Sequence, residues 1–313
     1  MRIGIDIMGG DFSPSTTIRG SILAKKNLPK DVEIIFYGVK ENITSLLEEY
    51  NTPINTFKII DCPEVIKMDE HPIKGLKQKP KSSISIGIKH LSENKIDGFA
   101  SAGNTGAMFV SGFHHIKPIS GIIRPCISSI LPKEDGKVGI LLDVGANADC
   151  KADVLYQFGV LGSLFAEYVF NIKNPRVGLL NLGEEESKGN LLTQSTYEIM
   201  KNNNEYNFIG NIEGTELFES KADVIVCDGF TGNIVLKQAE AFYKLIKKRN
   251  IKDDYFERFN YEIYGGTPIL GVNKTVVIGH GISNDIAIKN MIILTKNTIE
   301  ARLSDKIKET LIK

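Results

Sequence analysis

Four apolar runs in this chain each stop at a loop built from Gly, Asn and Asp, and a helical pattern follows each loop. The four stretches are 96–107 (IDGFASAGNTGA), 138–149 (VGILLDVGANAD), 176–190 (RVGLLNLGEEESKGN) and 223–233 (DVIVCDGFTGN). Apolar runs without polar alternation are typical of strands buried on both faces, as in a parallel sheet covered by helices. Because the carboxyl ends of parallel strands share one edge of a sheet, we expect these loops to line a ligand-binding edge.

The remaining patterns extend the same architecture over the whole chain. Further strands are predicted at 2–8, 32–37, 57–60 and 275–281, and helices at 14–26, 42–50, 83–93, 233–249 and from Asn284 onward. The predicted fold class is α/β, a doubly wound and mostly parallel sheet with helices on both faces. No linker or low-complexity break interrupts the pattern, so residues 1–313 are predicted to form a single α/β domain, in which a smaller lobe near 240–270 is left open.

Charge and cysteine content exclude several classes of protein. Lys and Arg number 38 and Asp and Glu also number 38, so no global field draws the chain to nucleic acid. An acidic partner must then meet a local patch, and the lysine-rich segment 67–83, expected to be a surface loop, is the candidate. The four cysteines are widely spaced, which fits reduced thiols rather than a zinc site. No signal peptide or membrane-spanning run is evident, so a cytoplasmic location is expected.

The loop SAGNTGA is the best candidate for an anion cradle. Gly103 and Gly106 allow a backbone to approach a ligand closely, and Ser101, Asn104 and Thr105 offer neutral donors at the start of a predicted helix. The competing interpretation is that Ser101 and Asn104 only cap that helix. We favour ligand contact, because a cap rarely needs both glycines.

The loop DVGANADC leaves its chemistry open. Asp143 and Asp149 are able to bind a metal, act as acid and base, or orient a lysine, and an Asx turn with a helix cap explains them equally well. Cys150 is a candidate acyl-accepting nucleophile. No His neighbours it in sequence, so a structural thiol is favoured.

Three further loops carry candidate residues. Lys188 follows three consecutive glutamates at an expected helix start, where it would be a point charge for phosphate or part of a solvated acidic cap. Asp228 and Asn233 border a glycine-bounded turn, and His280 stands at a strand end. Dinucleotide, Walker A and nucleophile-elbow motifs are all missing, which argues against an ordinary NAD enzyme, a P-loop ATPase or an α/β-hydrolase.

Seven motifs in one order give the chain a specific resemblance. They are MGGD, SAGNTGA, LLDVGANADC, GLLNLGEEESKGN, FIGNIEG, VCDGFTGN and YGGTPILGV, running from Met1 to about Asn290. In this order they resemble the bacterial phosphate acyltransferase (PlsX) family. The resemblance implies transfer of a fatty acyl group from acyl-carrier protein to inorganic phosphate, giving acyl-phosphate for phospholipid synthesis. It also implies a fold like that of isocitrate dehydrogenase and phosphotransacetylase, and no cofactor or metal.

The resemblance implies partners as well as a reaction. Acyl carrier protein would be the acyl donor, inorganic phosphate the acceptor, and a membrane glycerol-3-phosphate acyltransferase the consumer of the product. A homodimer is implied, with no nucleic acid. Weak or no direct membrane contact is expected: the segment 244–264 is short, and its basic run 244–249 is best explained as a solvated helix end. The expected location is therefore cytoplasmic, with peripheral contact at the inner face of the membrane as the alternative.

Motif matching and loop chemistry together define the predicted site. Phosphate is itself a nucleophile, so direct attack on the thioester needs no Ser or Cys; the enzyme must hold the dianion and stabilise the oxyanion. The residues assigned to catalysis are Lys188, Asn104, Asp228 and Asn233. The residues assigned to substrate binding are Asp11, Ser101, Gly103, Thr105, Gly106, Asn147, Asp149, Asn190 and His280.

One departure and three rival functions accompany this prediction. The family usually has His where this chain has Phe12, so any role of that His is absent here. A phosphotransacetylase using acyl-CoA is the nearest rival. A metal-dependent decarboxylating dehydrogenase would place Asp143 and Asp149 on Mg²⁺. A non-catalytic ligand-sensing protein is the third alternative, for which the number of polar glycine loops is excessive.

Overall fold

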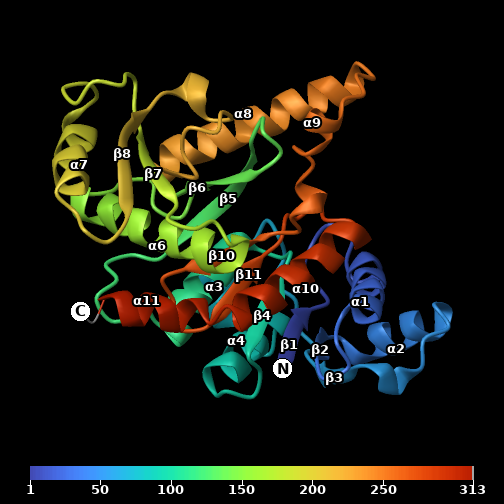
Figure 1. The fold of residues 1–313 in the computed structure, drawn as a ribbon. Helices are drawn as coiled ribbons and strands as arrows, with labels where there is room; N and C mark the ends of the chain where they lie inside the picture. Colours follow the sequence, from blue (N-terminus) through green and yellow to red (C-terminus); the bar gives the residue numbers. More distant parts are fainter. Residues whose placement is uncertain (312–313) are drawn as a thin grey trace. The chain divides into compact units, whose positions relative to one another are not determined.

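The structure is a computed structural model that describes residues 1–311, and their contacts group into two compact units. The first unit comprises Met1–Lys117 and Tyr261–Glu300, and the second comprises Pro118–Asn260 and the C-terminal segment from Ala301. Each unit is a sheet with helices packed on it (Figure 1). Each is described by itself below.

The first unit holds a sheet of six strands in the order β3-β2-β1-β4-β11-β10. The strands are β1 (Arg2–Asp6), β2 (Glu33–Gly38), β3 (Lys58–Asp61), β4 (Gly98–Ser101), β10 (Thr267–Leu270) and β11 (Thr275–Ile278). All neighbouring pairs are parallel except β10 with β11. The helical segments are α1 (Ser15–Asn27), α2 (Lys40–Glu49), η1 (Ile54–Thr56), α3 (Pro72–Gln78), α4 (Ser83–Ser92), α5 (Thr105–Ser111), η2 (Gly112–Ile116), η4 (Tyr261–Ile263) and α10 (Asp285–Glu300).

Helices cover both faces of this first sheet, as consecutive residues of β4 show. A Cβ added at Gly98 would meet Ile299 of α10 at 2.8 Å, so this position faces α10. The next residue, Phe99, lies against Gly87 of α4, where an added Cβ would come within 2.1 Å of its ring. Because successive strand residues point to opposite faces, α10 and α4 lie on opposite sides of the sheet.

The second unit holds a sheet of five strands in the order β5-β6-β9-β7-β8. They are β5 (Cys126–Pro132), β6 (Val138–Leu142), β7 (Arg176–Leu180), β8 (Asn207–Ile212) and β9 (Val224–Val226), and only β5 is antiparallel to its neighbour. The helical segments are α6 (Ala152–Phe170), α7 (Leu191–Lys201), η3 (Gly214–Glu216), α8 (Gly229–Lys248), α9 (Asp254–Glu257) and α11 (Leu303–Leu311).

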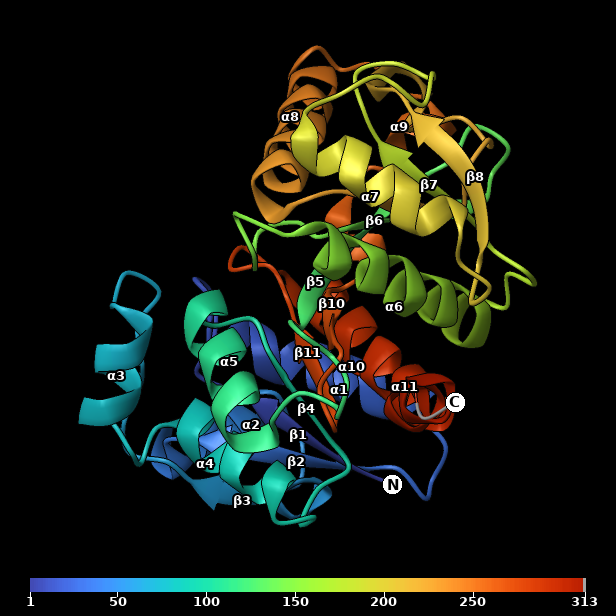
Figure 2. The same cartoon turned by 90° about the vertical axis from the view of Figure 1, so that its left-hand side faces the viewer.

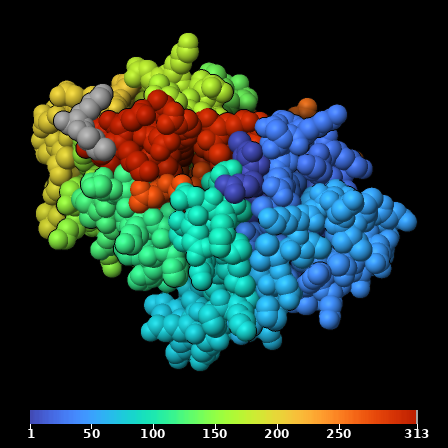
Figure 3. Space-filling model, turned by 90° about the horizontal axis from the view of Figure 1, so that it is seen from below, coloured from blue at the N-terminus to red at the C-terminus, as the bar shows by residue number. Residues whose placement is uncertain are grey.

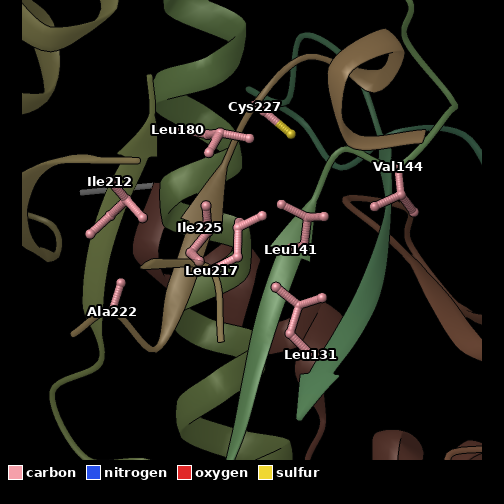
Figure 4. Close-up of a cluster of buried hydrophobic side chains, with 9 residues drawn as sticks. All are labelled: Leu131, Leu141, Val144, Leu180, Ile212, Leu217, Ala222, Ile225 and Cys227. Atoms are coloured by element: carbon pink, nitrogen blue, oxygen red, sulfur yellow. The ribbon is translucent and has the colours of Figure 1, made fainter. Parts of the chain in front are cut away.

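This second sheet is also buried on both faces. Leu142 of β6 lies against Gly162 of α6, where an added Cβ would meet its Cδ2 at 2.9 Å. The adjacent Leu141 instead joins Ile225 in an apolar cluster on the other face (Figure 4). Val235 of α8 packs against that cluster. The non-alternating apolar runs are thus explained by helices on either side.

The predicted fold class is confirmed, with local corrections. Segment 67–83 was expected to be a loop, but it contains the helix α3, which begins with proline at a first-turn position. The helix predicted at 233–249 begins earlier, at Gly229, and the C-terminal helical stretch is divided between α10 and α11 near Arg302, whose φ is +50°. Three strands, β5, β8 and β10, were not predicted.

The prediction of one domain stays a prediction, because grouping by contacts does not decide whether either unit folds alone. The expectation of a smaller lobe near 240–270 within that domain likewise stays a prediction. The chain passes from the second unit back to the first between Asn260 and Tyr261.

Candidate functional site

The carboxyl ends of β1, β4 and β11 meet at one edge of the first sheet, and their loops contact one another. The amide of Asp11 donates to the carbonyl of Gly281 at 2.8 Å, and the amide of Gly279 donates to the carbonyl of Ser101 at 2.8 Å. The loops carrying Asp11, Ser101 and His280 are therefore brought together, as the sequence predicted. The Asp11 side chain is exposed beside Gly281.

Ser101 is a buried partner of Asp6. Its hydroxyl donates to Asp6 Oδ2 at 2.6 Å and accepts from the amide of Gly103 at 2.9 Å. A Cβ at Gly9 would lie 2.6 Å from Asp6 Oδ2, and one at Gly103 would lie 3.0 Å from Ser101 Oγ. Burial raises the pKa of Asp6, against the opposing effect of its hydrogen bonds. Gly103 thus accommodates the packing of this pair, and Asp6 is a residue of this edge that sequence reasoning missed.

Asn104 uses both ends of its amide inside the protein. Its Oδ1 accepts from the amide of Ala107 at 2.9 Å and caps α5. Its Nδ2 lies 2.9 to 3.2 Å from the carbonyls of Lys67, Met68 and Glu70. The side chain is only 4% exposed. Asn104 therefore ties the start of α5 to the segment that precedes α3.

Two neighbours of Asn104 have different roles. An added Cβ at Gly106 would meet Pro72 at 2.4 Å, so this glycine permits α3 to pack against α5. Thr105 is exposed at the first position of α5. Within residues 1–311, no oxygen accepts a hydrogen bond from the amides of Thr105 and Gly106. These two N–H groups are the donors that this loop offers to an anion.

His280 is the remaining predicted residue of the first edge. Its ring lies 5.0 Å from the ring of Tyr261, and its Nδ1 accepts from the amide of Ile282 at 3.4 Å. The residue is half-buried.

In the second unit the parallel strands β6, β9 and β7 end at one sheet edge, where Asp143 organises the first loop. Asp143 is fully buried, and Oδ1 accepts from the amides of Ile127 and Ala146 at 3.1 and 3.2 Å. Oδ2 accepts from both nitrogens of Asn147, at 2.6 and 2.9 Å. Gly145 has φ +133°, which only glycine adopts readily. The observed geometry is that of a loop-shaping carboxylate.

The first turn of α8 packs on this same loop. The amide of Gly229 donates to the carbonyl of Asn147 at 2.8 Å, and a Cβ at Gly232 would fall 1.9 Å from the carbonyl oxygen of Asp143. Asp228 caps α8 by accepting from the amide and hydroxyl of Thr231, at 2.8 and 2.9 Å. The glycines of GFTGN are therefore needed for contact between the two loops.

Asn233 and Asp149 lie near the same loop. Asn233 donates through Nδ2 to the carbonyl of Val144 at 3.2 Å and is otherwise exposed. Asp149 is exposed, and its carbonyl accepts from Arg124 at 2.9 Å.

Lys188 stands in a loop whose acidic residues are held by other lysines. Glu186 pairs with Lys201 at 2.8 Å, and Glu184 pairs with Lys221. Within the described part of the chain, Glu185 is the carboxylate that pairs with Lys188, with 3.9 Å between the ammonium and the carboxylate. The Lys188 side chain is 47% exposed. The three glutamates thus shape the loop more than they neutralise Lys188.

The helix after this loop begins with a side-chain cap. Asn190 accepts through Oδ1 from the amide of Thr193 at 2.9 Å. Gly189, just before it, has φ +95°, and an added Cβ would meet Thr193 Oγ1 at 2.0 Å. Asn190 therefore fixes the entry to α7 directly beside Lys188.

The whole chain matches a known family. Residues 1–306 match the model of a family described as fatty acid synthesis protein. A protein named phosphate acyltransferase from Dictyoglomus turgidum is 40% identical, covering 100% of this chain and 98% of that protein. Proteins of the same name from Dictyoglomus thermophilum and Halothermothrix orenii are 41% and 39% identical over 100% of this chain. The chain belongs to the phosphate acyltransferase family.

Solved structures of distant sequence share the fold of this family member. A phosphotransacetylase from Streptococcus pyogenes matches with a TM-score of 0.70 at 19% identity, covering 96% of this chain and 94% of that one. The EutD phosphotransacetylase from Staphylococcus aureus matches with a TM-score of 0.66 at 16% identity, covering 96% of this chain and 94% of that one. The predicted fold likeness to phosphotransacetylase is thereby confirmed.

Cys150, the only candidate protein nucleophile named from the sequence, lies beside the Asp143 loop of this phosphate acyltransferase family member. Burial, followed by the charges of Asp143 and Asp228, raises the pKa of its thiol to about 11. Its sulfur lies 3.6 Å from the carbonyl oxygen of Asn147. A thiol with this pKa is almost entirely protonated at neutral pH and is a poor nucleophile.

Membrane-spanning helices and clusters of metal-ligating side chains are the remaining features to describe in this family member. In the part of the chain that the structure describes, no helix combines the length and apolarity that crossing a bilayer requires. Over the same residues, no three His, Cys, Asp or Glu side chains come together as metal ligands would.

Proposed function

We propose that this phosphate acyltransferase takes its acyl group from fatty acyl-carrier protein and that bound inorganic phosphate attacks the thioester directly. The observation that carries the reaction class is the full-length identity of about 40% to proteins named phosphate acyltransferase. The product, an acyl-phosphate, is a mixed anhydride suited to acylate an alcohol in phospholipid synthesis.

The proposed step needs no covalent enzyme intermediate. A phosphate oxygen forms a bond to the thioester carbonyl carbon, giving a tetrahedral oxyanion. Collapse of that intermediate breaks the carbon–sulfur bond, and the carrier thiolate leaves and takes a proton from water. A thiol pKa of about 8.5 makes this leaving group adequate without a strong general acid. The raised pKa of Cys150 supports direct attack over an acyl-cysteine route.

Each unit, taken by itself, offers donors to an anion. In the first unit, the amides of Thr105 and Gly106 are the proposed phosphate contacts. In the second unit, Lys188 is the proposed point charge, because the acidic partner it has among residues 1–311, Glu185, lies 3.9 Å away. Asp228 and Asn233 are proposed to hold the loop around Asp143 in place, through the α8 cap and the bond to Val144.

The other predicted substrate-binding residues take supporting roles in this proposal. Ser101 and Gly103 hold the Asp6 pair beneath the first edge, and Asn147 holds the Asp143 loop. Asn190 sets the direction of α7. Side chains that are exposed or half-buried at the two edges are the ones proposed to reach substrate: Asp11, Asp149 and His280.

A donor comparison tests this proposal. Palmitoyl-carrier protein and palmitoyl-CoA are each incubated with the enzyme, with and without phosphate, and thioester loss and acyl-phosphate formation are followed. We expect phosphate-dependent formation of palmitoyl-phosphate, with a higher kcat/KM for the carrier-bound donor. A higher kcat/KM for palmitoyl-CoA would identify a phosphotransacetylase-like enzyme instead. Thioester loss that is independent of phosphate would exclude the proposed reaction.

The proposal extends to location and assembly. We place the enzyme in the cytoplasm as a homodimer, delivering acyl-phosphate to a membrane glycerol-3-phosphate acyltransferase. Of the basic run considered for membrane contact, Lys247 pairs with Glu257 at 2.9 Å, which supports the interpretation as a solvated helix end. Ultracentrifugation of the purified enzyme with and without vesicles measures both properties.

A further inference from the structure

Residues 67–81 carry a local excess of positive charge on a chain with no net charge. The segment reads KMDEHPIKGLKQKPK, with five lysines against one Asp and one Glu. Lys67, Lys74, Lys77 and Lys81 are exposed. The helix α5, which packs beside α3, contributes no carboxylate. A further acid beside the segment is Glu64, which accepts from the amide of Lys81 at 2.7 Å.

The helix α3 presents its charged side outward. Gly75 is buried, and an added Cβ there would lie 3.0 Å from Ile66, so this position faces the body of the unit. At 3.6 residues per turn, Ile73 and Lys77 lie on the opposite side of the helix, with Lys74 on its flank. Ile73 is 46% exposed. The outward surface is therefore basic with a single apolar side chain.

One lysine of the segment has a structural task instead. The ammonium of Lys79 pairs with Glu70 and donates to the carbonyl of Val65 at 2.7 Å. The hydrogen bond from Lys79 holds the pKa of Glu70 below its usual value. Lys79 thus closes the segment on itself and is not one of the outward charges.

The segment is also fixed to the sheet edge of the first unit. The Asn104 side chain, which caps α5, bonds the carbonyls of Lys67, Met68 and Glu70. Met68 reaches over Gly281, where an added Cβ would lie 2.8 Å from its methyl group. Figure 2 shows α3 standing beside α5, and in Figure 3 the cyan segment that includes it projects at the lower edge. The basic surface therefore stands out from the protein while its base is held at the loop after β4.

We propose that α3 and the lysines Lys74, Lys77 and Lys81 form the docking surface for the acidic carrier protein that delivers the acyl thioester. This inference rests on the proposed donor. An acidic protein surface complements clustered lysines, and such rim charges mainly speed association. Asn104 ties the segment before α3 to the loop that begins α5, so a carrier docked on α3 is held at a fixed position relative to that loop. The amides of Thr105 and Gly106 in this loop are the proposed phosphate contacts. A lipid surface would gain nothing from this fixed position relative to the phosphate loop, which is why a protein partner is favoured.

Charge reversal separates docking from chemistry. The triple variant Lys74→Glu, Lys77→Glu, Lys81→Glu is assayed with palmitoyl-carrier protein and with palmitoyl-pantetheine, a thioester that lacks the carrier. At low salt we expect KM for the carrier substrate to rise about tenfold with kcat unchanged. At about 1 M salt the screening length falls to about 3 Å, which should shrink the difference. Turnover of palmitoyl-pantetheine should not change.

Two control variants sharpen the result. Reversing the exposed Lys26, Lys30 and Lys40 changes the net charge equally, and we expect it to leave KM for the carrier nearly unchanged. Lys79→Met should lower the melting temperature, because it removes the bond to Val65 and the pair with Glu70. An equal rise in KM for both reversal triples would show a net-charge effect and overturn the proposal.

Further outcomes distinguish a failure of the docking proposal from a failure of the proposed function. If wild-type enzyme consumes palmitoyl-carrier protein and the α3 triple has an unchanged KM at low salt, the carrier docks elsewhere and the proposed function stands. If the α3 triple loses binding to phosphatidylglycerol vesicles while that KM is unchanged, the surface serves a membrane. If wild-type enzyme does not consume the carrier substrate at all, the proposed donor itself is wrong.

Discussion

The loop after β4 in the first unit uses its polar side chains within the protein, whereas the loop after β7 in the second unit leaves a lysine exposed. In the first loop, Ser101 bonds Asp6 and Gly103, and the Asn104 amide is occupied at both ends. In the second, Glu184 and Glu186 pair with lysines outside the loop, and Lys188 has one acidic neighbour at 3.9 Å.

This difference changes how a glycine-rich loop at a sheet edge should be interpreted. Gly103 and Gly106 looked like sites of close ligand approach, yet each has a packing reason, the Asp6–Ser101 pair and Pro72 respectively. What the first loop offers an anion is backbone N–H, and what the second offers is a charge. Removing a side chain should therefore affect the two loops differently.

The largest effect is expected at Lys188. Lys188→Met should lower kcat/KM for phosphate by about 10²- to 10³-fold, on the order of 3–4 kcal/mol, because a charge meeting the dianion is lost. The melting temperature should stay close to that of wild type, since the side chain is half exposed. Steady-state kinetics with varied phosphate measure the effect.

Lys237→Met is the matched control for Lys188. Lys237 is also exposed and pairs with Glu240 at 3.0 Å on α8. We expect its kcat/KM to stay within twofold of wild type. Equal activity losses in the two variants would remove the special role of Lys188.

Lys133 is the buried counterpart of Lys188 in the second unit, and it should matter for stability rather than activity. It is 2% exposed and donates to the carbonyl of Leu217 at 2.8 Å, and burial lowers its pKa from 10.5 to about 8. The unfolded chain therefore binds more protons between these values, so the native state gains stability as pH rises through the window. The gain is up to about 3 kcal/mol.

Comparing wild type with Lys133→Met isolates this pH dependence. The free energy of unfolding of wild type should rise relative to the variant between about pH 8 and 10.5, and level off above and below that window. Urea unfolding at a series of pH values measures it. Parallel curves for the two proteins would mean that Lys133 is not protonated differently in the folded state.

Replacing Asn104 should lower activity less than replacing Lys188 does, and it should also lower the stability of the fold. Asn104→Ala removes the α5 cap and the bonds to three carbonyls, for a loss of about 2 kcal/mol. Asn104→Ser keeps a side-chain oxygen to cap α5 and loses the amide donors, so it should recover part of the stability. Thermal unfolding of both variants, with kcat and KM for the carrier substrate, measures this.

Whether Asn104→Ala affects stability and KM or instead kcat decides the role of this side chain. If Asn104→Ala keeps wild-type stability and loses about 10²-fold in kcat, the side chain acts on the transition state as the sequence first suggested. A loss confined to stability and KM supports a positioning role.

Much of the fold and part of the site were accessible from the sequence. The parallel strands were predictable because their runs, such as Val138–Leu142, lack polar alternation. The strand β5 was missed because its serines break the apolar run, and α3 because a helix of seven residues is too short for a periodic signal. Loops at strand ends were correctly placed at sheet edges.

The partners of polar side chains could not be predicted. Ser101 and Asp6 are 95 residues apart, and Asn104 bonds carbonyls more than 30 residues away. Such contacts depend on strand order, which a single sequence does not specify. An Asp within the first strand was the only available signal for Asp6, since a buried carboxylate needs partners.

Cys150 should contribute least of all. Its thiol pKa of about 11 leaves almost no thiolate at neutral pH, so Cys150→Ala should retain activity within about twofold. Initial rates with palmitoyl-carrier protein and phosphate provide the test. A loss of several hundredfold in a folded variant would make the thiol a participant.

The intact mass of the enzyme after mixing with palmitoyl-carrier protein in the absence of phosphate tests direct attack most directly. The sample is quenched, measured, and compared with one to which phosphate is added. Direct attack predicts unmodified enzyme in the first sample and palmitoyl-phosphate only in the second. Enzyme that carries a palmitoyl group without phosphate, and loses it to phosphate on addition, would contradict the mechanism proposed here.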